Sequence, residues 1–360
     1  MSVQTMDWVE HVSDRINSHQ IHHHRYKITR QRLFAETLVR KGGECIALVG
    51  PSRAGKTIIT IALEQMMNPQ ASDDFLVRRP VVRLTCRNRG DRGTFSTKAF
   101  FLDALATIKH PFYTIDGDDI AGNVESIRRN DRETTASLEA VLENALQVLR
   151  TKYLVIDETQ HLQYMTGGVQ SALQMMEFFK TLAEKLDIVL IFVGAYPIVN
   201  VLQLSPHLLG RICTIEMQRY SSDDEDDLIH FQEVLNWYSQ DVKFAAGVTG
   251  FGDWNRELFE GSLGVIGLLS AWIRNGMAEM LANGDNELTF AHMKSKRKES
   301  RFLNEMLREI VDGENYMRSA DNELFSLDSQ IHHNGPVKKR KGNKKPFQAK
   351  VKRRAVGGRS

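Results

Sequence analysis

The sequence predicts an α/β fold, in which helices cover both faces of a parallel β-sheet, followed by a smaller all-helical domain. Two observations predict this arrangement. Five short, mostly apolar runs alternate with helical segments, and they lie at residues 45–49, 81–86, 153–156, 188–193 and 213–217. Strands that are apolar along most of their length indicate a parallel sheet buried on both faces. After Tyr220 these runs end and only helical periodicity continues.

Helices are expected wherever apolar residues recur every three or four positions. Between the strands, such segments lie at residues 55–67, 97–108, 134–149 and 170–186. In the helical domain, they lie at residues 228–238, 257–259, 265–281 and 291–311. The consecutive acids at 223–227 fit the N-terminus of a helix, because the helix dipole favours negative charge there. Residues 114–133 are polar, and we expect a surface loop there.

These elements divide the chain of 360 residues into four parts. We expect an N-terminal helical segment at 1–40, an α/β domain at 41–220, and a helical domain at 221–313. Residues 314–360 are polar and then basic, with eleven Lys or Arg and no acid after residue 337. This composition cannot bury enough apolar surface to fold alone, so we expect a mostly disordered tail. Such a polycation could contact DNA, dock on an acidic partner or act as a nuclear signal.

Composition also argues against several classes of protein. No uncharged apolar stretch reaches the roughly 18 residues that a membrane span needs. Acidic Asp7, Glu10 and Asp14 stand where a secretory signal would be basic and then apolar. The three cysteines show no disulfide or zinc pattern, which is typical of a reducing cytoplasm. We therefore expect a cytoplasmic protein with no membrane partner.

A phosphate-binding motif follows the first apolar run. The stretch matches the pattern G-x-x-x-x-G-K-[ST], and its residues are Gly50, Pro51, Ser52, Arg53, Ala54, Gly55, Lys56 and Thr57. A strand before it and a helix after it are the context that this motif requires. Backbone N–H groups of the loop and the helix N-terminus bind phosphate oxygens. We expect Lys56 to bridge the β- and γ-phosphates of ATP and the Thr57 hydroxyl to bind Mg²⁺.

Two carboxylates end the third apolar run. Asp157 and Glu158 follow Tyr153-Leu-Val-Ile directly. Open α/β sheets bind ligands at the carboxyl ends of their strands, so both acids are expected beside the phosphates. We expect Asp157 to hold Mg²⁺, directly or through water, and Glu158 to polarise the attacking water. The pair favours a site that hydrolyses ATP over one that only binds it.

These motifs, with helices behind them, resemble the AAA+ ATPases, and within them the transposon-encoded regulators TnsC and TniB. Four stretches carry the resemblance, which spans roughly residues 20–300. The first is Gly50 to Thr57 and the second is LVIDETQHL at 154–162. The third is IFVGAYP at 191–197, followed by LLGR at 208–211. The fourth is GSLGVIGLL at 261–269, with LTFAH after it. The resemblance implies a P-loop AAA+ fold in which the helical domain is a lid.

The resemblance also implies roles that spacing cannot show. Arg211 matches the arginine finger that reaches the γ-phosphate of a neighbouring subunit, although a surface salt bridge is the alternative. His22 and Tyr26 correspond to the stretch that meets adenine, which fits the histidine tract better than metal binding does. The sensor I position holds Gly194-Ala195-Tyr196, without the usual polar side chain. Sensor II lacks its arginine, and Arg274 is a late substitute.

A basic group follows the second apolar run. Its members are Arg83, within that run, and Arg87, Arg89, Arg92 and Lys98 after it, and a loop with two glycines lies among them. Such a loop can follow a phosphate backbone without recognising bases. In TnsC-like rings, loops on this side of the domain line a channel that holds duplex DNA. The alternative is a solvated charged face.

The resemblance implies an ATP-dependent regulator of DNA transposition in the bacterial cytoplasm. It would assemble on duplex DNA, independently of sequence, as a hexamer or heptamer ring or as a filament. It would link target-selection proteins to the transposase, and ATP hydrolysis would reset it. Two alternatives stay open: another DNA-linked AAA+ ATPase such as an initiator or helicase loader, and a nucleotide-switched scaffold that binds only protein.

Overall fold

The computed structural model describes most of the chain, namely residues 21–68, 77–90, 93–113, 132–165, 167–204, 210–240 and 242–331. Three expectations therefore lie outside the described residues. They concern the helix within the first twenty residues, most of the polar loop at 114–133, and the basic run after residue 337. Arg92 also lies outside them.

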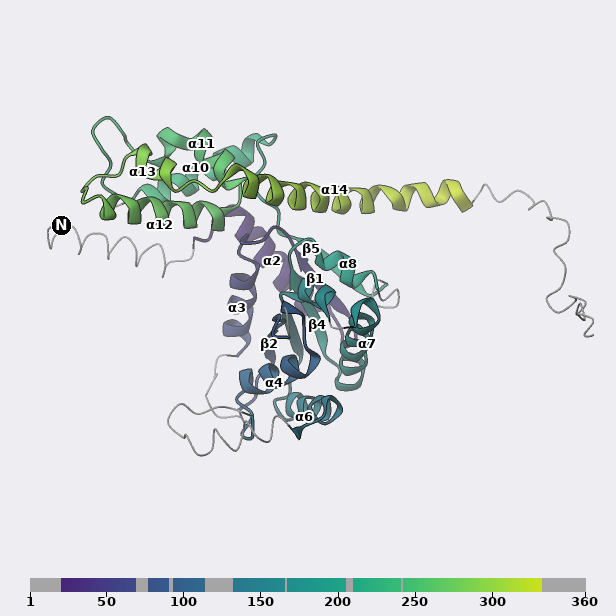
Figure 1. The fold of residues 1–360 in the computed structure, drawn as a ribbon. Helices are drawn as coiled ribbons and strands as arrows, with labels where there is room; N and C mark the ends of the chain where they lie inside the picture. Colours follow the sequence, from purple (N-terminus) through teal and green to yellow (C-terminus); the bar gives the residue numbers. More distant parts are fainter. Residues whose placement is uncertain are drawn as a thin grey trace, which may run out of the picture. The chain divides into compact units, whose positions relative to one another are not determined.

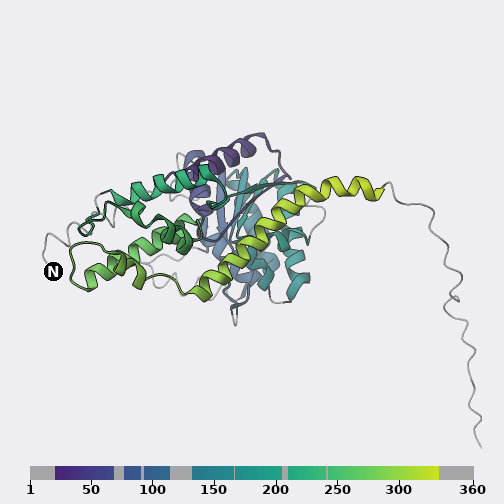
Figure 2. The same cartoon turned by 90° about the horizontal axis from the view of Figure 1, so that it is seen from above.

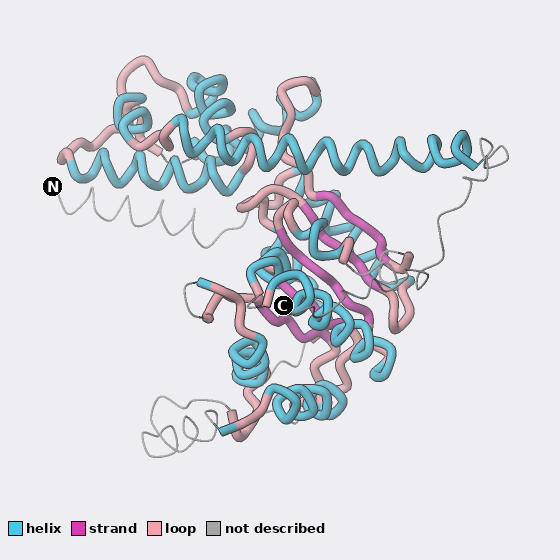
Figure 3. Tube along the Cα trace, turned by 45° about the vertical axis from the view of Figure 1, so that its right-hand side comes forward, coloured by secondary structure: helices cyan, strands magenta, loops and turns pink. Residues whose placement is uncertain are grey.

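Five parallel strands form the sheet in the order β2-β3-β4-β1-β5. Figure 1 labels β1, β2, β4 and β5, and Figure 3 shows the strands side by side in magenta. Their bounds are β1 Cys45–Val49, β2 Val81–Thr85, β3 Tyr153–Asp157, β4 Val189–Gly194 and β5 Ile212–Glu216. All five predicted strands are confirmed within one residue at each end. β1 and β4 are buried along their whole length, as expected for strands covered on both faces. Strand β1 lies between β4 and β5, although it comes first in the chain.

Helices cover both faces of the sheet. They are α2 His24–Val39, α3 Lys56–Met67, α4 Thr97–Thr107, α6 Thr135–Val148, α7 Gly168–Leu186 and the short α8 Ile198–Leu202. Leu33 of α2 and Ile59 of α3 share a buried cluster with Ile191 of the sheet. On the other face, Phe179 of α7 meets Phe192 edge to face at 6.0 Å between ring centroids. The alternation of Ile191 and Phe192 along β4 therefore supplies a core to each layer.

The helical part after β5 has its own core. Its elements are α10 Glu225–Ser239, the 3₁₀ helix η3 Phe251–Trp254, α11 Asn255–Ser262, α12 Ile266–Ala282, α13 Phe290–Ser295 and α14 Ser300–Ile331. Figure 2 shows α10 to α13, in green, to one side of the strands. The core combines aromatic residues with Leu, Ile, Val and Met, and Trp272 donates its indole N–H to the Met293 carbonyl at 2.6 Å. Asp224 caps α10, as the run of acids predicts.

The predicted helix at 291–311 is two helices. Thr289 begins α13 through a capping box with His292, and α14 begins only at residue 300. Between them lie the exposed, charged residues Lys296 to Glu299. The helical recurrence of apolar residues continues across this break, because a turn can join two helices without disturbing that recurrence. The break therefore cannot be predicted from apolar spacing alone. α14 then continues past residue 311 to Ile331.

The chain forms two compact units, Met1–Gly313 and Glu314–Ser360, and α14 begins in the first and ends in the second. The first unit holds the sheet, its covering helices and the helical part. None of the helices among the described residues has the length and apolar character to cross a membrane.

Candidate nucleotide site

The glycines of the phosphate-binding loop are required by its path. The Met217 amide donates to the Val49 carbonyl at 2.7 Å, which holds the loop against the chain after β5. A Cβ at Gly50 would lie 2.3 Å from the Met217 oxygen, so only glycine fits there. Gly55 has φ 108°, a left-handed conformation that favours glycine, and it starts α3. The loop therefore ends with the N-terminus of α3, as the motif predicts.

Lys56 is buried, with 8% of its surface exposed. Its ammonium group donates to the carbonyls of Gly50 at 2.9 Å and Pro51 at 2.6 Å. Burial lowers the pKa of Lys56 to about 8, because the charged form loses hydration, and the carboxylates of Glu158, Asp157 and Glu309 only partly offset this. The loop thus holds its cation in a site of low polarity, where a phosphate group would interact strongly with it.

Thr57 and Asp157 come together at the carboxyl edge of the sheet. The Thr57 hydroxyl donates to the Asp157 carboxylate. Asp157 is 3% exposed, and burial raises its pKa despite this hydrogen bond and one from the Glu158 amide at 2.9 Å. The Arg83 guanidinium lies 3.9 Å from Asp157. One hydroxyl and one carboxylate are a donor set that fits Mg²⁺, which is bound by few protein oxygens together with substrate phosphates.

Among the described residues, no group of three or more His, Cys, Asp or Glu side chains could hold a metal ion. The three adjacent histidines point to different partners. His22 stacks on Tyr26, His23 contacts the Tyr220 hydroxyl at 3.0 Å, and His24 stacks on the ring of His230.

Glu158 follows Asp157 in a left-handed conformation, with φ 56°. This conformation is uncommon for residues other than glycine, and it turns the chain sharply into the 3₁₀ helix η2, Thr159–Tyr164. The carboxylate accepts a hydrogen bond from the Gln160 amide at 2.5 Å and lies 3.8 Å from His161. His161 in turn contacts Asn88 at 3.2 Å. Gln160 and His161 lie within the stretch at 154–162 that carries the resemblance, but sequence reasoning gave them no role. Asn88 was missed because it belongs to no motif.

The end of β4 lies between the two motifs, since β4 separates β3 from β1. Ala195 and Tyr196 are both buried. Tyr196 donates to Glu216 at 2.8 Å, so its hydroxyl points toward β5. The Ala195 amide donates to Gln160 at 3.3 Å. The sensor I position therefore has a polar neighbour that comes from η2 and not from β4.

Arg211 lies at the opposite edge of the sheet from the phosphate-binding loop of its own chain. It directly precedes β5, and its carbonyl accepts from the Cys45 amide at the start of β1. Its guanidinium pairs with Glu184 at 2.6 Å, and the two side chains are 48% and 45% exposed. The loop follows the other end of β1, about 16 Å further along the strand. Arg211 is therefore about half exposed and forms a surface salt bridge, the alternative to an arginine finger.

His22 and Tyr26 stack with their rings 4.9 Å apart and 5° from parallel. Tyr26 is buried in the cluster that contains Ala54 of the phosphate-binding loop, whereas His22 is exposed. His23 is half-buried, and the loss of hydration lowers its pKa to about 3, so it stays neutral. Tyr26 thus packs the first turn of α2 into the same buried cluster as the phosphate-binding loop.

The helical part also meets the loop. A Cβ at Gly267, in the first turn of α12, would lie 2.2 Å from the Arg53 carbonyl. Arg274 is on the same helix, and its guanidinium donates to the Ser270 hydroxyl at 3.0 Å. The first turn of α12 therefore lies against the phosphate-binding loop, and Arg274, two turns later, is bonded to its own helix.

The basic group after β2 is only partly described. Arg87 is exposed, and Arg89 is 54% exposed and pairs with Asp103 of α4. Lys98 lies in the first turn of α4. Arg83, earlier in β2, pairs with Glu64 at 3.4 Å and with Asp157, so it belongs to the nucleotide site.

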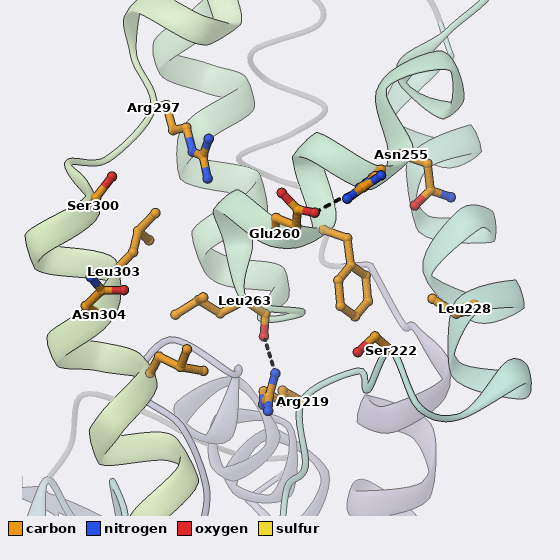
Figure 4. Close-up of a pocket in the computed structure, with 13 residues that line it drawn as sticks. Arg219, Ser222, Leu228, Asn255, Glu260, Leu263, Arg297, Ser300, Leu303 and Asn304 are labelled. Atoms are coloured by element: carbon orange, nitrogen blue, oxygen red, sulfur yellow. Dashed lines mark hydrogen bonds and ion pairs between the residues drawn. The ribbon is translucent and has the colours of Figure 1, made fainter.

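A separate cavity of about 800 Å³ lies in the first unit (Figure 4). Its walls come from α10, α11 and the first turns of α14, and include Leu228, Phe259 and Leu303. Arg219 donates to the Leu263 carbonyl at its edge. None of the residues of the phosphate-binding loop lines it.

Comparison with protein families matches residues 39–202 to an AAA domain. Comparison with curated proteins gives no match. Among solved structures, a Walker-type ATPase of Pyrococcus abyssi is 16% identical, with a TM-score of 0.46, over 84% of this chain and 75% of that one.

Two Aeropyrum pernix structures are also similar. The ORC2 protein, in ADPNP-ADP complexes, is 11% identical over 75% of this chain and 66% of that one, with a TM-score of 0.49. The ORC1 protein, in complex with DNA, is 12% identical over 77% and 65%, with a TM-score of 0.48. The chain thus spans slightly less than two thirds of either Aeropyrum protein. From the sequence match, the parallel sheet and the loop between β1 and α3, we conclude that residues 39–202 are an AAA domain in a chain with the P-loop AAA+ fold.

Proposed function

We propose that this protein binds and hydrolyses ATP and uses the bound nucleotide to control its assembly on duplex DNA. One observation carries the proposal. The loop that holds Lys56, and the pair Thr57 and Asp157, meet at the carboxyl edge of the sheet. Open α/β sheets bind their ligands at this edge.

Each residue of the motif has a role in this proposal. The loop amides and Lys56 bind the phosphates, and Lys56 neutralises charge that develops on the γ-phosphoryl group. Thr57 and Asp157 would hold Mg²⁺, which would neutralise phosphate charge. Glu158 orients and polarises the water that attacks the γ-phosphorus. His22 and Tyr26 contact the adenine.

The position of Arg211 supports a site shared between subunits. Its guanidinium is exposed and lies a strand's length from its own loop. In a closed ring or a filament, each subunit presents one face to the opposite face of the next. Arg211 would then reach the γ-phosphate in the neighbouring subunit and stabilise transition-state charge there. ATP would therefore favour assembly, and hydrolysis would favour disassembly.

The basic residues after β2 support DNA as the polyanion that the assembly holds. Arg87 and Arg89 are exposed, and Lys98 is close to them in sequence. Repetition of this group around an oligomer would give many phosphate contacts from a few residues per subunit. Together with the resemblance to TnsC and TniB, this favours a regulator of DNA transposition that links target selection to the transposase. A transposase gene beside the gene for this chain would support that role.

The proposal is tested by DNA binding with a nonhydrolysable ATP analogue. We expect salt-sensitive binding of duplex DNA that requires the analogue. Replacing Arg87 and Arg89 by alanine should weaken it and flatten its dependence on salt. Alanine at Arg256 and Arg301, which removes two exposed charges from the helical part, is the matched control.

The alternatives give different results in the same experiment. ATP-dependent assembly without DNA affinity at low salt would favour a scaffold that binds only protein. Equal losses in both double variants would assign Arg87 and Arg89 to a solvated charged face. DNA binding without any effect on a transposase would favour an initiator or a helicase loader.

A further inference from the structure

The end of β4 has an unusual composition for the site proposed above. Gly194, Ala195 and Tyr196 offer no small polar side chain toward the phosphates, since the Tyr196 hydroxyl is bonded to Glu216. Yet Glu158 needs a fixed orientation to act on water. The residues that surround Glu158 therefore decide how this chain orients its carboxylate.

Gln160 occupies the space that a side chain at position 194 would need. A Cβ built on Gly194 would lie 2.3 Å from the Gln160 oxygen Oε1. Real Cβ atoms do not approach an oxygen so closely, so a larger residue at 194 would displace Gln160. Gly194 has no left-handed backbone that would call for glycine. The close approach of Gln160, together with Ile198 atoms at 3.2 and 3.3 Å, is thus the reason that the structure offers for a glycine at the end of β4.

Both ends of the Gln160 carboxamide are engaged. Its oxygen accepts from the Ala195 amide at 3.3 Å, and its nitrogen donates to Glu158 Oε2 at 2.5 Å. Only the nitrogen can donate to a carboxylate and only the oxygen can accept from an amide, so the partners determine the orientation. One side chain therefore links the end of β4 to Glu158.

The backbone that carries Gln160 is also held firmly. The hydroxyl of Thr159, which is fully buried, donates to the Ile156 carbonyl at 2.7 Å. This bond ties the first turn of η2 to β3. Gln160 therefore projects from a fixed point of the backbone.

We propose that Gln160 is a positioning residue for ATP hydrolysis. From η2, Gln160 supplies the polar group that β4 lacks, and it orients Glu158 toward the attacking water. The inference rests on the proposed function, because it assigns Glu158 to hydrolysis. Gln160 acts through Glu158 and touches no reacting atom. It should influence the rate of hydrolysis and leave nucleotide affinity unchanged, since Lys56 and the loop bind the phosphates.

The experiment removes the polar side chain at position 160 of η2 and places one at position 194, at the end of β4. Gln160→Met keeps the volume of the side chain but removes both hydrogen bonds, and we expect kcat to fall about tenfold or more with KM within about twofold. Gly194→Asn alone should also lower kcat, because the new side chain collides with Gln160. The double variant Gln160→Ala with Gly194→Asn should recover a large part of the rate, since the collision is gone and a carboxamide again ends near Glu158.

Gln163→Met is the matched control, because Gln163 is in the same 3₁₀ helix and makes no hydrogen bond to Glu158 or Ala195 among the described residues. Thermal unfolding of every variant tests for a purely structural tie between β3 and β4. The single variant Gln160→Ala is the reference for the double variant. The inference would be overturned if the loss of rate follows a loss of stability, or if the double variant is no faster than Gln160→Ala alone. A wild-type kcat in Gln160→Met would also overturn it.

The same measurements separate this inference from the proposed function. If the wild-type chain binds ATP but does not hydrolyse it under any condition that allows assembly, both fail. If the wild-type chain hydrolyses ATP and Glu158→Gln does not, while Gln160→Met is fully active, only the role of Gln160 fails.

Discussion

Nucleotide affinity should fall about eightfold when the pH rises from about 7.5 to about 9, because Lys56 loses its proton in that interval. With a pKa of about 8, Lys56 is about three-quarters protonated at the lower pH and about one-tenth protonated at the upper one. Phosphate oxygens favour the ammonium form, so binding must first return the missing proton. Nucleotide affinity is therefore greatest at pH values far below 8, where Lys56 is protonated, and it is lost as the pH rises through 8. The loss corresponds to about 1.2 kcal/mol.

Titration calorimetry with ADP measures this effect, since the phosphate ionisations of ADP are complete below the interval. Buffers of different ionisation enthalpy also count the protons, and we expect uptake of about 0.9 proton per nucleotide at pH 9 and about 0.2 at pH 7.5. An arginine stays charged throughout, so Lys56→Arg should show no such fall, whatever its absolute affinity. A wild-type affinity that stays constant across the interval, without proton uptake, would refute the reasoning.

Three further predictions concern the shared site and the fold. Glu158→Gln should bind ATP, hydrolyse it at least about a hundredfold more slowly and remain assembled; unchanged turnover would remove Glu158 from its role. Arg211→Ala should hydrolyse ATP about a thousandfold more slowly. It should recover activity when mixed with Lys56→Ala chains, because the Lys56→Ala chains supply Arg211 to the intact phosphate-binding loops of the Arg211→Ala chains. A mixture as inactive as its components would contradict a role of Arg211 between subunits. Asp227→Ala should lower the free energy of unfolding by about 3 kcal/mol, because it leaves the Arg25 guanidinium, now 2.6 Å from that buried carboxylate, without its charge partner. The exposed neighbour Asp226→Ala is the control in chemical denaturation, and equal effects would count against the pair.

Local patterns along the chain were sufficient for the strands and for the phosphate-binding loop. Each strand is a run of apolar residues with turn residues at its ends, and such a run has the same meaning wherever it lies in the sheet. The loop depends on glycines at fixed spacing within eight residues, so its conformation is also a local property. The acids after Ile156 could be placed for the same reason.

One local feature was missed as well, namely the break after α13, because the helical recurrence of apolar residues continues through it. Contacts between distant segments could not be predicted from the sequence. The partner of Arg83 was missed because β2 and β3 pair only in the folded sheet, where Thr85 lies opposite Asp157.

The sequence by itself determined which residues could bind phosphate and metal, since that chemistry depends on residue types at short spacing. Only the tertiary structure decided how they are arranged and tuned. The strand order places the end of β4 between the loop and Asp157, and there Gly194 makes room for Gln160. Burial lowers the pKa of Lys56, and no short motif encodes burial. The physical reason is that hydration, proton affinity and side-chain orientation depend on every neighbour in space, whereas a motif records only neighbours along the chain.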